Sequence, residues 1–380
     1  MRRNIYMKKI TALCLAIILM LSLAACAGGA TPGAATPAAP VNTAGAPAAP
    51  APVQGEFKLR LCHPFLASSM INESVVLFKQ QVEEQSGGRI LVEVYSDASL
   101  MPTDQMIPAV LDGTIEATSM YAFNLVNISP MYRIFDMPMI FGDTDVCIDN
   151  IMDFYKSDTF QNECLVDFEN AGFKYYPTIQ DVDRSIWTTE KEVTTADGFQ
   201  GMKIRSVGGI GAELLAKAWG FSSITISSTE LPTALMQGTV AGAIIGSVYG
   251  YDTKPPALKY CIMAQTDYAG TNGLIISKEW YDKLPADLQT VIDEAGMMQF
   301  QWTLEQTVDR AQQNTKENGR IETDMGVQVV FLSEEVRQQL WDKYAPVLAD
   351  FCKDNERLAN FVAIANSEYN IYSQEYKDTH

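Results

Sequence analysis

The chain has 380 residues, 47% of them hydrophobic, and a formal net charge of −18 at pH 7. A chain of this length can bury a large core and can form two lobes. Its acidic balance argues against nucleic acid or an anionic membrane surface as a partner.

The N-terminal residues read as a secretion leader. Four basic residues, all within residues 2–9, precede an apolar run over residues 10–23, which is too short for a permanent membrane-spanning helix. The run ends in the sequence LAAC at residues 23–26, small residues before a cysteine that becomes lipidated. We therefore predict a signal peptide over residues 1–25 and a lipid on Cys26. An ordinary signal peptide with an incidental cysteine is the alternative.

The next segment, residues 26–56, is predicted to be a tether. Residues 27–53 are nearly all Ala, Gly, Pro and Thr without any charge, so this stretch cannot bury a core. Two acyl chains on Cys26 would hold the protein firmly to the outer face of the cytoplasmic membrane. Loss of the leader's four positive charges changes the net charge from −18 to about −22.

Strand and helix patterns alternate in the next part of the chain. Short apolar or alternating runs indicate strands, and apolar residues at helical spacing indicate helices. The expected elements are a strand at 57–61, a helix at 72–85, a strand at 90–95, a helix at 103–113 and a strand at 115–121. This order predicts a mostly parallel, doubly wound sheet.

The same alternation returns after residue 200. The expected elements are a strand at 202–207, a helix at 211–219, a strand at 223–226, a helix at 229–237, a strand at 240–245, a long helix from 285 to about 318, a strand at 327–331 and a helix at 333–352. Two α/β units crossed more than once by the chain place a cleft at the carboxyl ends of their strands, where ligands bind in open α/β sheets.

Patterns for catalysis, metals and cofactors are scarce. The chain has only two histidines, His63 and His380, and it lacks the nucleophile-elbow, phosphate-loop and zinc-protease motifs. Five cysteines lie outside the leader and the lipid site, and their spacing matches no CxxC metal pattern: Cys62, Cys147, Cys164, Cys261 and Cys352. We expect mainly buried free thiols, with a Cys147–Cys164 disulfide left open. The sequence predicts no enzyme, no cofactor and no metal site.

One cation stands out in the sequence GFQGMKIRSV at residues 198–207. The apolar strand ends in Arg205, and Gly208, Gly209 and Gly211 follow closely. A guanidinium is always charged, and its planar fork matches a carboxylate with two hydrogen bonds. Arg205 is therefore a candidate anion receptor, and a structural salt bridge is the alternative.

Six stretches follow one another in the chain: EEQSGGRI at 83–90, AVLDGTIE at 109–116, FDMPMIF at 135–141, FQGMKIR at 199–205, TELPTALMQGTVAG at 229–242 and GLIISKEWYDKLPADLQ at 273–289. In this order they resemble the substrate-binding proteins of tripartite ATP-independent periplasmic (TRAP) transporters, of the dicarboxylate-binding DctP type. The resemblance covers nearly all of residues 57–372.

The resemblance implies a two-lobed, periplasmic-binding-protein-like (type II) α/β fold with a central cleft and a long helix spanning both lobes. A hinge motion closes the cleft on the ligand. The implied lobe I is 57–181 plus about 271–309, lobe II is 182–270 plus about 310–372, and 373–380 is a tail. The implied partners are a small organic carboxylate and the small and large membrane subunits, and we expect a monomer.

The resemblance also implies site residues. The arginine at the end of the GxKxR strand clamps the ligand carboxylate in this family, and Arg205 holds that position. A second arginine about twenty residues upstream corresponds to Arg184. The other expected ligand-binding residues are Trp187, Tyr121, Phe65, His63, Ile245, Ser247, Tyr249 and Asn272. Packing in the core or hinge is the alternative for the aromatic residues and for His63.

One departure from the family pattern bears on the ligand. Family members often read VDGxEN where this chain reads VAGAIIG at 240–246, so that Ile245 replaces an asparagine that commonly hydrogen-bonds the ligand. The pocket is therefore expected to be more apolar than a sugar-acid site, with Phe123 among its aromatic walls. We predict an aromatic or aliphatic monocarboxylate ligand. A co-receptor for a membrane sensor kinase is the alternative function, and a surface enzyme acting on small acids is a weaker one.

Overall fold

The computed structural model describes residues 54–142, 144–180, 184–264 and 271–379. All of them belong to the unit that runs from Pro52 to His380. The predicted leader, Cys26 and most of the tether lie outside the described residues, as does the side chain of Cys147. Within the described part, no helix combines the length and the apolarity needed to cross a bilayer.

Sheet A holds the strands of the first α/β run and two further strands. Its order is β2 (Ile90–Tyr95), β1 (Phe57–Cys62), β3 (Ala117–Tyr121), β10 (Thr271–Ser277) and β4 (Phe173–Ile179). Strand β1 is parallel to β2 and β3, whereas β10 is antiparallel to β3 and β4.

Sheet B holds the strands of the second run. Its order is β11 (Gln328–Phe331), β9 (Tyr260–Met263), β5 (Arg184–Thr188), β8 (Gly242–Gly246), β6 (Lys203–Ser206) and β7 (Ser222–Thr225). Strand β6 is parallel to β7 and β8, and β9 is parallel to β11, whereas β5 is antiparallel to β8 and β9.

The strands of the two expected α/β runs are parallel, as predicted, but each sheet also contains antiparallel pairs. The antiparallel pairs all involve β5 and β10. The chain enters one sheet after leaving the other at both of these strands, from β4 to β5 and from β9 to β10, and again at β11, which is parallel to β9.

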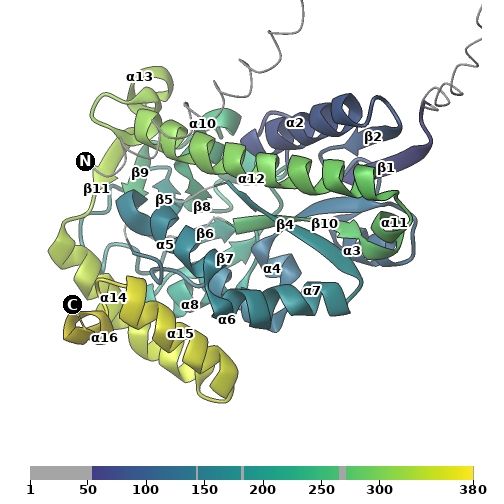
Figure 1. The fold of residues 1–380 in the computed structure, drawn as a ribbon. Helices are drawn as coiled ribbons and strands as arrows, with labels where there is room; N and C mark the ends of the chain where they lie inside the picture. Colours follow the sequence, from purple (N-terminus) through teal and green to yellow (C-terminus); the bar gives the residue numbers. More distant parts are fainter. Residues whose placement is uncertain (1–53, 143, 181–183, 265–270, 380) are drawn as a thin grey trace, which may run out of the picture. The chain divides into compact units, whose positions relative to one another are not determined.

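Helices connect and cover the strands (Figure 1). Those before residue 260 are α2 (Met70–Gln85), α3 (Thr103–Leu111), α4 (Ala122–Leu125), η1 (Pro130–Asp136), α5 (Thr144–Lys156), α6 (Asp158–Phe160), η2 (Gln161–Leu165), α7 (Val166–Asn170), α8 (Ile210–Trp219), α9 (Leu231–Met236) and α10 (Ser247–Thr253). Those after it are α11 (Lys278–Asp282), α12 (Ala286–Thr315), α13 (Arg320–Met325), α14 (Glu334–Cys352), α15 (Glu356–Tyr369) and α16 (Gln374–Thr379).

The long helix expected from the sequence is α12, which has 30 residues. It contacts α2 and β4 beside sheet A and α10 and α13 beside sheet B. In Figure 1 it passes both sheets lengthwise, from the end near α11 to the end near α13. The α/β fold with two sheets and a long helix that joins them is confirmed.

The hydrophobic core is shared between the sheets. One cluster of buried residues includes Met120 and Ile275 from sheet A together with Ile204 and Ile244 from sheet B. The strands fall into the two sheets along the sequence intervals expected for two lobes, but the lobe boundaries themselves stay a prediction. Four cysteines are buried free thiols: Cys62, Cys164, Cys261 and Cys352.

Candidate functional site

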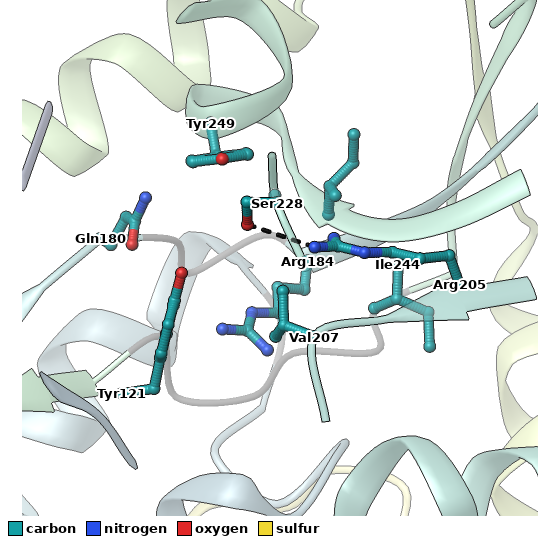
Figure 2. Close-up of a pocket in the computed structure, with 10 residues that line it drawn as sticks. Tyr121, Gln180, Arg184, Arg205, Val207, Ser228, Ile244 and Tyr249 are labelled. Atoms are coloured by element: carbon teal, nitrogen blue, oxygen red, sulfur yellow. Dashed lines mark hydrogen bonds between the residues drawn. The ribbon is translucent and has the colours of Figure 1, made fainter. Parts of the chain in front are cut away.

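A pocket lies where residues of sheet A meet residues of sheet B (Figure 2). The empty space in and around it, the open mouth included, is about 320 Å³. It is lined by Tyr121, Gln180, Arg184, Arg205, Val207, Ser228, Ile244, Ile245, Gly246 and Tyr249. Polar and charged groups therefore share the pocket with a few aliphatic side chains.

Arg205 is a fully buried cation at this pocket. It lies on β6, between β8 and β7, and its exposed fraction is 0%. Its guanidinium donates from Nε to the backbone oxygen of Ile226 at 2.8 Å and from Nη2 to Oγ of Ser228 at 3.2 Å. Both acceptors belong to the loop between β7 and α9, so the loop fixes the direction of the guanidinium plane.

The charge of Arg205 lacks a carboxylate partner among the described residues. Burial lowers the pKa of the guanidinium to about 10, the phenols of Tyr121 and Tyr249 raise it, and the positive charge of Arg184 lowers it. The salt bridge that was the alternative reading of Arg205 is not formed within the part of the chain described. A buried guanidinium of this kind favours an anion supplied from outside the chain.

Arg184 brings a second positive charge to the pocket. It is the first residue of β5 and lies opposite Gly246 on β8. In Figure 2 its guanidinium points toward the ring of Tyr121. The buried carboxyl of Asp136 lies within its electrostatic reach, because the charge of Arg184 lowers the pKa of that acid.

Tyr121 forms an aromatic wall of the pocket at the end of β3. Its ring meets Phe65 edge-on, with 4.6 Å between ring centroids, and stacks on Phe123 at 5.2 Å. Tyr249, in the first turn of α10, lines the pocket as well and is buried. Aromatic packing of this kind holds the Tyr121 ring in one orientation.

Five of the ten residues expected from the sequence line the pocket together. They are Arg205, Arg184, Tyr121, Ile245 and Tyr249. The other five do not line it: Trp187, Phe65, His63, Ser247 and Asn272.

Trp187 is placed on the wrong side of its strand for a pocket residue. Side chains alternate along a strand, so Trp187 and Arg184 point to opposite faces of β5. The Trp187 ring is fully buried, donates from Nε1 to Oγ of Ser185 at 2.9 Å, and packs so closely on Gly250 that a Cβ there would lie 2.7 Å from the ring. It belongs to a core cluster behind sheet B.

The remaining four lie behind the pocket wall. Phe65 supports the ring of Tyr121, and His63 lies beyond Phe65, with 5.7 Å between their ring centroids. Burial lowers the pKa of His63 to about 4, so the ring is neutral at physiological pH. The backbone oxygen of Ser247 accepts a bond from Asn314. Asn272 donates to Oε1 of Gln180 at 3.2 Å and so orients a side chain that does line the pocket.

Sequence reasoning missed five lining residues: Gln180, Val207, Ser228, Ile244 and Gly246. Ile244 and Gly246 belong to the VAGAIIG stretch, which departs from the family pattern. That stretch was already assigned to the site through Ile245, so both residues could have been predicted from the sequence. Gln180 and Ser228 follow strands in loops, where no periodic pattern marks them. Among the described residues, no group of three or more His, Cys, Asp or Glu side chains is arranged to hold a metal ion.

The sequence matches the bacterial extracellular solute-binding proteins of family 7, DctP, over residues 63–355. A solute-binding protein from Verminephrobacter eiseniae is 27% identical over 228 residues, which is 57% of this chain and 64% of that protein. The chain therefore spans somewhat less than two thirds of the length of this curated relative.

Two crystal structures share the fold. The sugar acid binding protein DctPAm from Advenella mimigardefordensis, in complex with galactonate, has a TM-score of 0.70 at 20% identity and covers 82% of this chain and 98% of its own. DctP7 from Bordetella pertussis, an extracytoplasmic solute receptor binding pyroglutamic acid, has a TM-score of 0.68 at 16% identity and covers 80% and 99%.

At such low identity, both matched structures establish the fold alone. The family match spans far more than half of the residues, from the end of β1 to the end of α14. The chain belongs to the bacterial extracellular solute-binding proteins of family 7, the DctP family.

Proposed function

We propose that this protein captures a small organic monocarboxylate with an aromatic or aliphatic body and delivers it to the membrane subunits of a TRAP transporter. The observation that carries the proposal is the fully buried guanidinium of Arg205, which faces a pocket without a carboxylate partner among the described residues. A ligand carboxylate would supply the missing negative charge.

The energetics favour an anion at this place. A carboxylate that loses its water is costly to bury unless it is paired and hydrogen-bonded. Arg205 is held in place by Ile226 and Ser228 before any ligand arrives. The orientation cost of the guanidinium is therefore already met by the fold, which strengthens binding.

Two cations favour an anionic ligand. Arg184 and Arg205 both line the pocket. Burial raises the pKa of the nearby Asp136 to about 6, and the charge of Arg184 lowers it. A carboxylate in the pocket would meet a positive surrounding.

Aliphatic side chains favour an apolar ligand body. Val207, Ile244 and Ile245 line the pocket and offer no hydrogen-bonding group from their side chains. A hydroxyl placed against them would lose its water without compensation.

A panel of acids tests the ligand class. Phenylacetate and hexanoate represent aromatic and aliphatic monocarboxylates, while succinate, galactonate and pyroglutamate represent a dicarboxylate, a polyhydroxylated acid and a cyclic amide acid. A compound that binds only the folded state raises its melting temperature. We expect phenylacetate or hexanoate to give the largest rise. A larger rise with succinate or galactonate would contradict the proposed ligand class.

The lipid anchor is a separate part of the proposal, and it rests on the sequence of residues 1–56. We expect the native protein in the membrane fraction, with a diacylated Cys26 as its first residue. Mass spectrometry of the N-terminal peptide measures this directly. The variant Cys26→Ser is the matched control and should release the protein from the membrane, whereas an unmodified Cys26 in the native protein would refute the anchor.

A further inference from the structure

Asp136 occupies an unusual position for a carboxylate. It ends η1, its exposed fraction is 3%, and its Oδ2 accepts bonds from the backbone N–H groups of Ile210 at 2.7 Å and Gly211 at 3.2 Å. These groups belong to the first turn of α8, whose N-terminal donors have no partner within the helix. The helix has no side-chain cap of its own, because its N-cap residue is Gly209. The cap comes from a distant segment of the chain.

The loop after Arg205 is shaped to admit this carboxylate. Gly209 has a φ of +92°, and a Cβ added there would lie 2.6 Å from Oδ1 of Asp136. Gly208 has a φ of +115°, and a Cβ added there would lie 3.7 Å from the ring of Phe123. Both positions need glycine for their backbone conformation, and Gly209 also needs it for space. This accounts for the bare backbone beside Arg205.

The two contacts join the loop to the wall of the pocket. Phe123 stacks on Tyr121, which lines the pocket, and Val207, which also lines it, immediately precedes Gly208. Asp136 thus holds the start of α8, and the ring of Phe123 lies near Gly208 in the same loop. If the start of α8 moved, Val207 and the end of the Arg205 strand would move with it.

The charges around Asp136 fit a fixed anion. Arg184 on β5 and Arg133 on η1 both lower its pKa, whereas burial, the largest influence, raises it. The first turn of α8 also carries Glu213, whose side chain is exposed. The positive end of the α8 dipole adds to the stabilisation of the carboxylate.

We propose that Asp136 is a positioning residue of the ligand site: its carboxylate clamps the N-terminus of α8 and thereby fixes the Val207–Gly209 loop beside Arg205. The inference rests on the proposed carboxylate-binding function. It goes beyond it by assigning affinity for the ligand to a residue that does not line the pocket.

The experiment compares ligand affinity with stability in matched variants. Phenylacetate and pyroglutamate are titrated calorimetrically into the wild type and into Asp136→Ala, Asp136→Asn, Gly209→Ala and the double variant Asp136→Ala/Gly209→Ala. Gly238→Ala is the control for backbone strain, since Gly238 has a φ of +67° and no atom within 4 Å of an added Cβ. Melting temperatures are measured without ligand.

We expect Asp136→Ala to weaken ligand binding about tenfold or more. Loss of a helix cap lowers the stability of a helix by a comparable factor. Asp136→Asn should stay within about threefold, because an amide oxygen accepts the same two bonds. Gly209→Ala should also weaken binding, since its Cβ displaces the carboxylate. The affinity of the double variant should lie within about twofold of that of the single variant that binds ligand less tightly. Both substitutions remove the same contact, so their effects should not add.

The possible failures are distinguishable. If Asp136→Ala lowers the melting temperature but leaves affinity unchanged, or if the two substitutions act additively, the positioning role is overturned. If the wild type binds none of the acids in the panel, the proposed function fails instead. Hydrogen exchange in the ligand-free protein then decides the inference: faster exchange at residues 207–211 in Asp136→Ala supports the clamp, and unchanged exchange overturns it.

Discussion

Replacing Arg205 by methionine should separate the binding function from the stability of the protein. Methionine is long and unbranched, so it fills the space of the side chain with an apolar group. We expect Arg205→Met to lose affinity for the carboxylate while the ligand-free protein becomes slightly more stable. Buried charges kept for function are often a cost to the ligand-free fold.

The size of the effect follows from the surroundings of the guanidinium. Burial lowers the pKa of Arg205 to about 10 from an ordinary 12.5, which corresponds to a cost of about 3 kcal/mol for burying the charge. Because the folded-state pKa of this base is depressed, the cost is present at every pH below about 10. The substitution also removes the bonds to Ile226 and Ser228, worth about 1 kcal/mol each. The net gain is about 1 kcal/mol, or roughly 2 °C in melting temperature.

The loss of affinity should be much larger than this gain. Removing one partner of a buried ion pair costs about 3–5 kcal/mol, because the other charge stays buried and unpaired. This corresponds to a loss of about a hundredfold or more in the affinity for phenylacetate. Calorimetric titration measures the affinity, and thermal unfolding without ligand measures the stability.

Arg357→Met on α15 is the matched control. Arg357 bonds to Glu163 at the surface, where an ion pair contributes about 0–1 kcal/mol, so both readouts should stay close to wild type. If Arg205→Met binds phenylacetate with unchanged affinity, the guanidinium does not bind the ligand carboxylate. A melting temperature several degrees lower would refute the reasoning on burial, since it would mean that Ile226 and Ser228 more than compensate the buried charge.

Three further substitutions test neighbouring parts of the account. Ile245→Asn places an amide in the apolar wall and should weaken phenylacetate binding about tenfold while improving galactonate binding; titrations that show unchanged selectivity would contradict the apolar wall. Trp187→Phe loses the bond to Ser185 and should lower stability by about 1–2 kcal/mol with affinity unchanged; a selective loss of affinity would return Trp187 to the site. Asp136→Asn should raise stability in urea unfolding at pH 7.5 by up to about 3 kcal/mol. The reason is that burial raises the pKa of this acid to about 6 from 3.8, so the stability contributed by the protonated acid is lost as the pH rises through about 6. The gain should vanish below about pH 4, and a gain independent of pH would contradict the electrostatic account.

Arg205 is predictable from the sequence because it breaks the pattern of its own segment. An apolar strand that ends in arginine and continues into glycines places a charge where it cannot stabilise a hydrophobic core. The family resemblance then suggests that this charge binds the ligand. The structure adds the reason for the glycines, since Gly209 leaves room for Asp136. That contact joins segments more than seventy residues apart, and a single sequence carries no signal for such a distance.

Trp187 shows the opposite case. It was expected beside the ligand because it is an aromatic residue near the arginines, but it does not line the pocket. Once residues 184–188 are recognised as β5, alternation alone separates Trp187 from Arg184. Gln180 and Ser228 are different, because their places depend on how the chain leaves β4 and β7. Loop geometry of this kind follows from tertiary packing, which local patterns do not encode.

The long helix α12 connects the pocket to both sheets through polar bonds. Thr303 accepts from the backbone N–H of Ile179, and Thr307 donates to the backbone oxygens of Ile179 and Gln180. Farther along, Asn314 donates to the backbone oxygen of Ser247. The same helix therefore holds the residue that carries Gln180 into the pocket and the first turn of the helix that carries Tyr249.

If a hinge motion closes the cleft, as the family resemblance implies, these hydrogen bonds along α12 would rearrange more easily than apolar contacts. Each of these bonds contributes about 1 kcal/mol, whereas a hydrogen bond to a charged group contributes about 1.5–3 kcal/mol. A carboxylate bound to Arg205 thus supplies enough free energy to exchange one or two of the bonds along α12. An apolar seam of the same length would cost far more to rearrange, since about 25 cal/mol is lost for each Å² of apolar surface exposed. If the cleft closes on its ligand, as the family resemblance implies, the polar residues of α12 would therefore make that closure energetically accessible while the core on either side stays packed.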